Sequence, residues 1–180
     1  MNGTGGFVNP DKVLVQLDIK EGMKIADFGC GHGYFAIPIA RAVGSEGRVY
    51  AIDVLAEALE AVRSRAQLEN IVNIETSRGN LETPGGSNLG DSSVDMVLLH
   101  NVLFQSQKKS DIIKEARRVL KAGGSFEIID WQEVRASIGP ENGWRLAPEE
   151  ARRLAESEGF IFAKSFDAGE YHFGLLFRQP

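Results

Sequence analysis

The sequence predicts an α/β protein built on a doubly wound, Rossmann-like sheet. The chain has 180 residues, of which 43% are hydrophobic, a size that suits one globular domain with a sizeable core. Short apolar runs of strand length alternate with segments of helical length, which is typical of parallel strands buried on both faces. A glycine-rich turn directly follows the first apolar run, where a sheet of this class binds its ligand.

The elements are expected in a regular order along the chain. A short amphipathic helix over 10–17 precedes a strand over 23–28, a helix over 34–43, a strand over 48–52 and a helix over 55–68. The third strand is expected over 72–76 and the fourth over 94–99, followed by a helix over 108–120 and a fifth strand over 125–130. Each strand and the helix after it form one βα unit of a parallel sheet.

The end of the chain departs from this alternation. A helix over 148–158 precedes two apolar runs, 160–166 and 171–177, which only a short connection separates. Strands joined so tightly must be antiparallel, since a parallel pair needs a longer crossover. We therefore expect a parallel sheet with a C-terminal antiparallel hairpin. Tyr171 and His172 open the last strand and are interpreted as structural, far along the sheet from the expected cofactor.

The most informative motif is the turn Asp27-Phe28-Gly29-Cys30-Gly31-His32-Gly33 after the first strand. Glycine has no Cβ, so a ligand can lie against bare peptide groups near the free N–H groups of a helix start. A dinucleotide fingerprint would place its third glycine at position 34, whereas here it stands at Gly33. Asp27 would also repel a pyrophosphate. Both features disfavour an NAD-linked oxidoreductase, which remains the less favoured alternative.

An acid followed by three alternating glycines resembles the first motif of the class I S-adenosylmethionine-dependent methyltransferases; it is read here at Asp27, Gly29, Gly31 and Gly33. This family also ends its sheet in an antiparallel hairpin, so the resemblance covers nearly the whole chain. The sequences of residues 22–31, 118–124 and 146–150 are similar to those of small methyltransferases related to the ubiquinone and menaquinone C-methyltransferases. The resemblance implies S-adenosyl-L-methionine as cofactor. It does not identify the substrate, because the chain lacks room for the inserted lid of the quinone enzymes.

Further cofactor contacts are expected at neighbouring strand ends. Asp53 ends the second strand, where a carboxylate can accept hydrogen bonds from both ribose hydroxyls, although it would also cap the following helix well. Asn80 takes the place of a family aspartate that accepts a hydrogen bond from adenine, and Gly79-Asn80 also fits a simple turn. The loop over 83–93 is expected to be mobile. The expected cofactor-binding residues are Asp27, Gly29, Cys30, Gly31, Gly33, Asp53, Val54, Asn80, Leu81 and His100.

His100 is also the candidate catalytic residue. By resemblance, a backbone carbonyl near His100 contacts the amino group of the methionine moiety, and Asp27 helps to hold that group. The imidazole titrates near neutrality and could act as a general base; a polar residue that only caps the strand end is the alternative. The candidate substrate contacts are Asn101, Trp131, Trp144 and Arg145, with a purely covering role for the two tryptophans as the alternative.

Composition argues against several other classes of function. The formal net charge is −5 and the basic residues are scattered, which disfavours nucleic acid as a partner. The single cysteine, Cys30, and the lack of a signal peptide or membrane span predict a cytoplasmic protein. No metal is implied, because the fourth strand ends in His100 and Asn101 rather than in carboxylates, and one thiol is too few for arsenic.

The sequence therefore predicts a methyltransferase that uses S-adenosyl-L-methionine to methylate a small molecule by in-line displacement, without a metal. The alternative is a cofactor-binding regulatory or partner subunit without catalysis, because the missing lid leaves the cleft open. An open cleft would also suit a homodimer or a partner subunit that completes the pocket. Residues 1–9 are expected to form a flexible tail, and residues 10–180 the single cofactor-binding domain.

Overall fold

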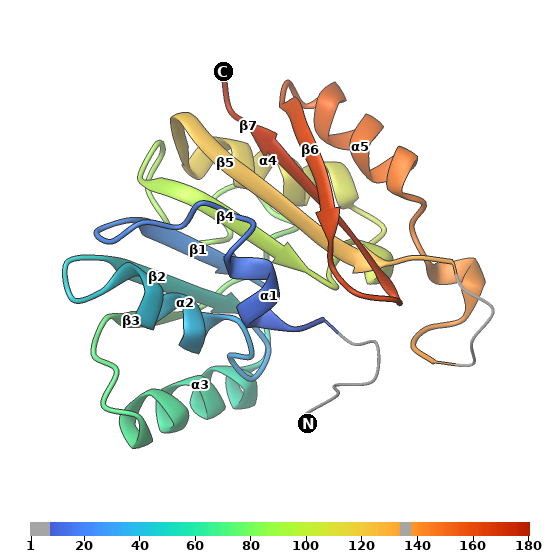
Figure 1. The fold of residues 1–180 in the computed structure, drawn as a ribbon. Coiled ribbons are helices and arrows are strands. Elements are labelled where there is room, and N and C mark those ends of the chain that lie inside the picture. Colours follow the sequence, from blue (N-terminus) through green and yellow to red (C-terminus); the bar gives the residue numbers. More distant parts are fainter. Residues whose placement is uncertain (1–7, 134–137) are drawn as a thin grey trace.

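The computed structural model describes residues 8–133 and 138–180. In this part of the chain, seven strands form one sheet in the order β3-β2-β1-β4-β5-β7-β6 (Figure 1). The first five strands are parallel, whereas β7 pairs antiparallel with β5 and with β6. The prediction of a doubly wound parallel sheet that ends in an antiparallel hairpin is confirmed. The strand order reverses between β1 and β4, which is where such a sheet binds ligands.

The strands are β1 (Lys24–Phe28), β2 (Arg48–Asp53), β3 (Ile74–Arg78), β4 (Val94–His100), β5 (Leu120–Trp131), β6 (Ile161–Asp167) and β7 (His172–Arg178). The helices are α1 (Pro10–Leu14), α2 (Ala36–Val43), α3 (Ala56–Leu68), α4 (Lys109–Val119) and α5 (Pro148–Ser157), with short 3-10 turns η1 (Leu103–Gln105) and η2 (Asn142–Trp144).

Two of the expected strand boundaries were wrong, each for a physical reason. Strand β3 begins two residues later than expected, because Val72 is 84% exposed and precedes the pairing with β2. Strand β5 begins at Leu120, immediately after α4, and includes Gly123 and Gly124, which lie before the expected start at residue 125. Leu120 pairs with Val94 before a shift in register, so tertiary pairing extends the strand through a segment of low strand propensity.

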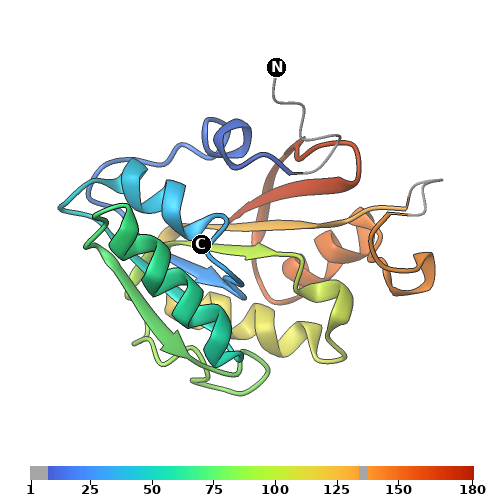
Figure 2. The same ribbon diagram turned by 90° about the horizontal axis from the view of Figure 1, so that it is seen from below.

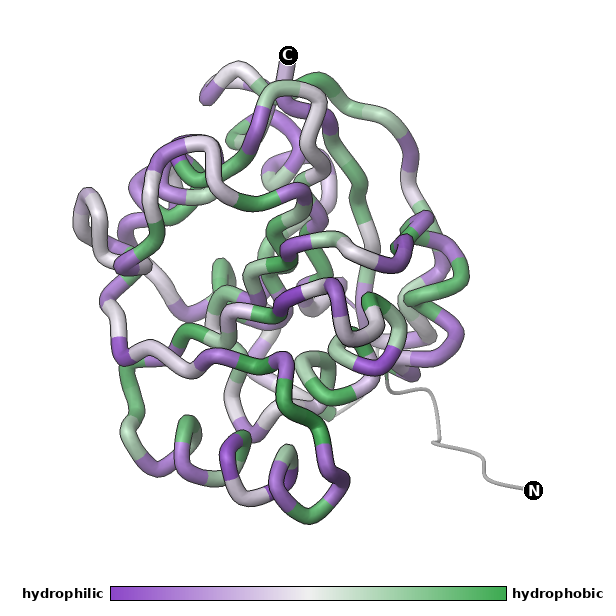
Figure 3. Tube along the Cα trace, turned by 90° about the vertical axis from the view of Figure 1, so that its left-hand side faces the viewer, coloured by the Kyte–Doolittle hydropathy of each residue, from purple (hydrophilic) through white to green (hydrophobic). Residues whose placement is uncertain are grey.

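Helices cover both faces of the sheet, and each face has its own core. One core lies under α1, α2 and α3, and the other under α4 and α5; Figure 2 shows α2 and α4 on opposite sides of the strands. Helix α3, at the bottom of Figure 3, alternates hydrophilic and hydrophobic residues along its tube, and its buried side chains include Leu59 and Val62. This pattern is expected of a helix with one buried face.

The segment before α1 packs against the domain. Residues 1–7 of the expected tail lie outside the described residues, whereas Val8 is buried and Asn9 caps α1 by accepting from the Lys12 N–H. The Val8 carbonyl accepts a hydrogen bond of 3.1 Å from the Tyr34 hydroxyl. Packing therefore begins at least two residues before the expected boundary at residue 10.

The loop over 83–93, which we expected to be mobile, is held by the buried carboxylate of Glu115 on α4. This carboxylate accepts from the backbone N–H of Gly85 and Ser87, each at 3.0 Å, and from Arg118 Nε at 2.9 Å. Arg118 also donates to the Leu89 carbonyl at 2.8 Å. A glycine-rich composition suggested mobility, but a buried acceptor on another element fixes this backbone.

Removing the Glu115 side chain is expected to destabilise the protein strongly. Glu115→Ala leaves the buried N–H group of Ser87 and the part-buried N–H group of Gly85 without an acceptor and Arg118 without its main partner, so we expect the free energy of unfolding to fall by about 3 kcal/mol. Urea unfolding measures the change. Lys114→Ala, at an exposed position of the same helix, is the control and is expected to change stability by less than about 0.5 kcal/mol.

The same carboxylate gives stability a dependence on acid pH. Burial alone would raise the pKa of Glu115, but hydrogen bonds from Arg118 and Ser87 outweigh it and lower the pKa from 4.5 to about 2. The contribution is complete above the unfolded-state pKa of 4.5 and is lost as the pH falls towards 2. An acid-unfolding midpoint that is the same in Glu115→Ala and in the wild type would contradict this assignment.

Candidate functional site

Two adjoining cavities open at the carboxyl ends of β1, β2 and β4, where the strand order reverses. The larger has a volume of about 760 Å³ and extends from the glycine turn over Asp53 and Asn80. The smaller, of about 420 Å³, extends from the same turn towards Trp131 and β7. Four residues line both cavities: Gly29, Gly31, His100 and Asn101. The two cavities therefore meet at these residues.

The glycine turn has the backbone geometry that the sequence predicts. Gly29, Gly31 and Gly33 have φ of 72°, 49° and 77°, a region that L side chains rarely adopt. A Cβ at Gly31 would meet no atom within 4 Å, so this residue presents bare peptide to open space. A Cβ at Gly29 would lie 2.4 Å from Val102 Cγ2. The turn is thus built for close approach on one side by Val102 and on the other by a ligand.

Asp53 connects the glycine turn to the start of α3. Its Oδ2 accepts a hydrogen bond from the Gly31 N–H at 2.9 Å, and its Oδ1 accepts from the Leu55 N–H at 3.0 Å. Each carboxylate oxygen retains capacity for a second donor. Asp53 and Val54 line the larger cavity. The bond to Leu55 forms a turn just before α3, whose N-cap is Leu55 itself and which no side chain caps, so helix capping by Asp53 is not observed. Contact with a ribose stays a prediction that this geometry allows.

Asn80 and Leu81 form the far wall of the larger cavity. The Asn80 amide oxygen accepts from the Glu82 N–H at 3.0 Å, which is the turn interaction that we gave as the alternative to ligand binding. Leu81 is buried and presents an apolar surface. Contact of either residue with adenine stays a prediction.

Asp27, at the end of β1, is a buried carboxylate that lacks a full set of partners. The residue is 2% exposed, and its Oδ2 has no hydrogen-bond partner among the described residues. Burial raises the pKa of Asp27 to about 6, although the nearby positive charge of His100 opposes the rise. An unpaired buried carboxylate oxygen beside a turn of exposed peptide groups fits a cationic group such as an ammonium.

His100 lies between the two cavities and forms an ion pair with a residue that sequence reasoning missed. Its Nε2 is 2.9 Å from Oε2 of Glu127 on β5, and the two side chains are 8% and 0% exposed. The Phe35 ring packs on the imidazole with 3.8 Å between centroids. Burial, the largest single influence, would lower the pKa of His100, but the charge and close approach of Glu127 together with the charges of Asp27 and Asp130 outweigh it, so the pKa is raised. The available signal was a glutamate inside an apolar strand, at 126–129.

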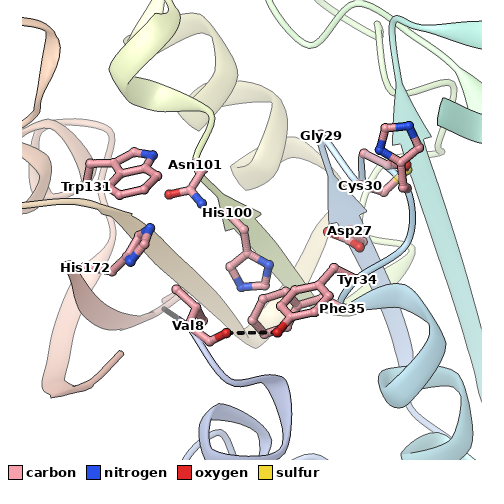
Figure 4. A pocket seen from close by; sticks show the side chains of 12 residues that line it. Val8, Asp27, Gly29, Cys30, Tyr34, Phe35, His100, Asn101, Trp131 and His172 are labelled. Atoms are coloured by element: carbon pink, nitrogen blue, oxygen red, sulfur yellow. Dashed lines mark hydrogen bonds between the residues drawn. The ribbon is translucent and has the colours of Figure 1, made fainter. Parts of the chain in front are cut away.

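His172 lines the smaller cavity together with Asp27 and Gly29 of the glycine turn, so the expectation that it is purely structural and far along the sheet from the cofactor was wrong. Because β7 runs antiparallel to β5, its first residue pairs with the last residue of β5, Trp131. The Trp131 and His172 rings are 4.2 Å apart between centroids. Figure 4 shows both on one side of His100, with Asp27 on the other. Burial lowers the pKa of His172 to about 4, helped by the charge of His100.

The remaining predicted site residues divide between the cavities and the surface beyond them. Cys30 and Trp131 line the smaller cavity, and Asn101, with a φ of 55°, lines both. Trp144 is 55% exposed, and neither it nor Arg145 lines either of these cavities. Arg145 Nε donates to the Pro140 carbonyl at 2.9 Å, and its Nη1 donates to the Gln132 carbonyl at 2.8 Å. Substrate contact by these residues stays a prediction.

The described residues contain neither a cluster of metal ligands nor a helix that could span a membrane. No three side chains among His, Cys, Asp and Glu lie close enough to hold a metal ion in residues 8–133 and 138–180. No helix in the same part of the chain has the length and hydropathy needed to span a bilayer.

Comparison with known proteins gives a consistent result. Residues 19–159 match the family described as "Methyltransferase domain". A demethylmenaquinone methyltransferase from Bacillus mycoides is 28% identical over 151 residues, which are 83% of this chain and 60% of that protein. An arsenite methyltransferase from Aquipseudomonas alcaligenes is 29% identical over 121 residues, which are 65% of this chain and 35% of that protein. The chain thus spans between about a third and three fifths of these curated relatives.

The fold is similar to solved structures over almost its whole length. The crystal structure of a SAM dependent methyltransferase from Aquifex aeolicus superposes with a TM-score of 0.88 at 26% identity, covering 97% of this chain and 91% of that one. The family match covers most of the chain, and the glycine turn and the sheet that carries it agree with that match. The chain belongs to the class I S-adenosylmethionine-dependent methyltransferase family.

Proposed function

We propose that this protein binds S-adenosyl-L-methionine across the glycine turn and directs its methyl group to a small molecule held in the smaller cavity, by in-line displacement and without a metal ion. The observation that carries the proposal is the unpaired, buried Asp27 carboxylate oxygen beside Gly29 and Gly31, which line both cavities. A cationic amino acid moiety would satisfy this oxygen.

We assign a role to each cavity from the residues that line it. Asp53 would accept from the ribose hydroxyls in the larger cavity, with Asn80 and Leu81 near the base. Asp27 would hold the amino group of the methionine moiety where the two cavities meet. When bound, the cofactor supplies an activated methyl group, so the protein has mainly to align the acceptor and exclude water. Alignment alone can supply roughly 7–11 kcal/mol in well-oriented systems.

Calorimetry with S-adenosylhomocysteine tests the proposed cofactor site. The wild type is expected to bind, and Asp53→Ala is expected to bind at least about tenfold more weakly, because one charge-assisted acceptor and the anchor of the Gly31 N–H are lost. Asp18→Ala, at an exposed position before β1, is the control. No binding by the wild type, or full binding by Asp53→Ala, would contradict the proposal, and binding of NADH alone would favour an oxidoreductase.

Methyl transfer itself is tested with a protein-free extract of small molecules and methyl-labelled S-adenosylmethionine. A labelled small molecule that forms only with the protein supports catalysis. Tight binding of S-adenosylhomocysteine with no labelled product would favour the cofactor-binding subunit instead. A cytoplasmic location and a homodimer or partner subunit stay predictions.

A further inference from the structure

Glu127 is a buried carboxylate that the cofactor site does not use. It is 0% exposed on β5, in register with Leu98 of β4 and Leu176 of β7, so the paired residues on both sides are apolar. A carboxylate buried among apolar side chains costs several kcal/mol unless an opposite charge and hydrogen bonds compensate it. A leucine or valine would fill a strand position of this kind without that cost. The presence of a glutamate at this position therefore indicates that its charge has a role.

The charged groups around Glu127 indicate that its role is to interact with His100. His100 Nε2, 2.9 Å from Glu127 Oε2, is the cation in the ion pair that Glu127 makes among the described residues. Three other titratable groups act on the pair or border it: Asp27 from β1, Asp130 from β5 and His172 from β7. Asp130 accepts from the N–H groups of Phe104 and Trp131, so it has partners of its own.

The position of Glu127 selects one tautomer of His100. A neutral imidazole whose Nε2 faces a carboxylate keeps its proton on Nε2 and therefore its lone pair on Nδ1. His100 Nδ1 has no hydrogen-bond partner among the described residues, and Nε2 has the 2.9 Å approach of Glu127 Oε2 as an ion-pair contact but no aligned hydrogen bond. His100 also lines both cavities, and Phe35 packs against its ring and restrains it. The free nitrogen is thus a proton acceptor at the junction where methyl donor and acceptor would meet.

We propose that Glu127 is the positioning residue of a His100–Glu127 pair that removes a proton from the methyl acceptor, and that the acceptor is accordingly a weak acid, such as a hydroxyl, a thiol or an ammonium, that arrives protonated. This inference rests on the proposed methyl transfer. The acceptor's lone pair forms the new bond to the methyl carbon, and the electron pair of the broken bond stays on sulfur. The acceptor's proton passes to His100 Nδ1 and from there to solvent.

Nitrogen-15 NMR of the imidazole rings tests the role of Glu127 without any substrate. The chain has three histidines, so His100 can be assigned with one substitution at each. In the wild type we expect the Nε2–H tautomer and a raised His100 pKa. In Glu127→Gln, which preserves the shape and removes the charge, the pKa is expected to fall by about one unit or more. Glu127→Asp, which keeps the charge, is expected to retain most of the rise.

Glu115→Gln is the matched control for this titration, because it removes a buried carboxylate on α4, whose buried side chains pack in the core on the other face of the sheet from Phe35, the residue that packs on His100. It is expected to leave the His100 titration unchanged even where it lowers stability. The proposal is overturned if Glu127→Gln leaves the pKa and tautomer of His100 as they are in the wild type.

The pH profile of methyl transfer to the labelled acceptor tests the proton step. In Glu127→Gln we expect kcat to fall about tenfold or more, the KM for S-adenosylmethionine to stay constant, and the acid limb to move to lower pH. An acid limb that coincides with that of the wild type would overturn the role of Glu127. Absence of labelled product with the wild type would instead overturn the proposed function, while the NMR titration would still decide whether Glu127 controls His100.

Discussion

Asp27→Asn is expected to stabilise the free protein and to abolish most of its affinity for the cofactor. Burial raises the pKa of Asp27 from 3.8 to about 6, so at pH 7 the folded protein holds a carboxylate that its surroundings disfavour. The neutral amide removes that cost and can still accept from the Ala36 N–H. We expect the free energy of unfolding at pH 7 to rise by about 2 kcal/mol. Cofactor affinity is expected to fall about 100-fold, because an amide cannot neutralise an ammonium.

The pH dependence of the wild type gives an independent check on Asp27. The folded protein retains the proton on Asp27 up to a pH of about 6, whereas the unfolded chain releases it near 3.8. The contribution of Asp27 to stability is therefore lost as the pH rises through 6, and cofactor affinity is gained over the same interval. Urea unfolding at pH 4 and pH 7, with calorimetry at both, measures the two trends. A variant less stable than the wild type at pH 7 would show that Asp27 has a structural role.

Gly29→Ala is expected to cause a large loss of both stability and binding. The φ of 72° is unfavourable for alanine, and the new Cβ would lie 2.4 Å from Val102 Cγ2. Because Val102 directly follows Asn101, relief of the clash would displace a segment that lines both cavities. We expect about 3 kcal/mol of destabilisation and loss of measurable S-adenosylhomocysteine binding. Urea unfolding measures the stability, and calorimetry measures the binding.

A double mutant separates the two causes of this loss. Val102→Ala removes the atom that the new Cβ would meet, so Gly29→Ala combined with Val102→Ala should be less unstable than the sum of the single variants. The part that remains reports the backbone strain. Gly90→Ala is the control, since a Cβ there meets no atom within 4 Å and its φ is not positive. Additive effects at positions 29 and 102 would show that steric contact is not the cause.

The glycine turn and the order of the sheet could be predicted because their signals are local. Asp27, Gly29, Gly31 and Gly33 lie within seven consecutive residues, and the spacing of the glycines directly indicates a backbone that needs positive φ and close approach. Apolar runs likewise indicate buried strands without knowledge of their neighbours.

The two residues that sequence reasoning placed wrongly or missed depend on pairing between distant strands. His172 reaches the cavity only because it pairs with Trp131 across an antiparallel ladder, and that register cannot be read from either strand alone. Glu127 is significant only because it meets His100 from the neighbouring strand. Local propensity also failed for the loop over 83–93, which Glu115 fixes from α4.

The contact between Val8 and Tyr34 has a practical consequence for identifying the acceptor. Val8 lines the smaller cavity, so an affinity tag fused to residue 1 would be attached only seven residues from the proposed acceptor site. Strand β7, by contrast, ends at Arg178, which pairs with Ser125 in the first half of β5, and so lies at the end of the strands opposite the cavities. Protein for acceptor screens is therefore best purified with a tag on residue 180, since an N-terminal tag could compete with the compound being sought.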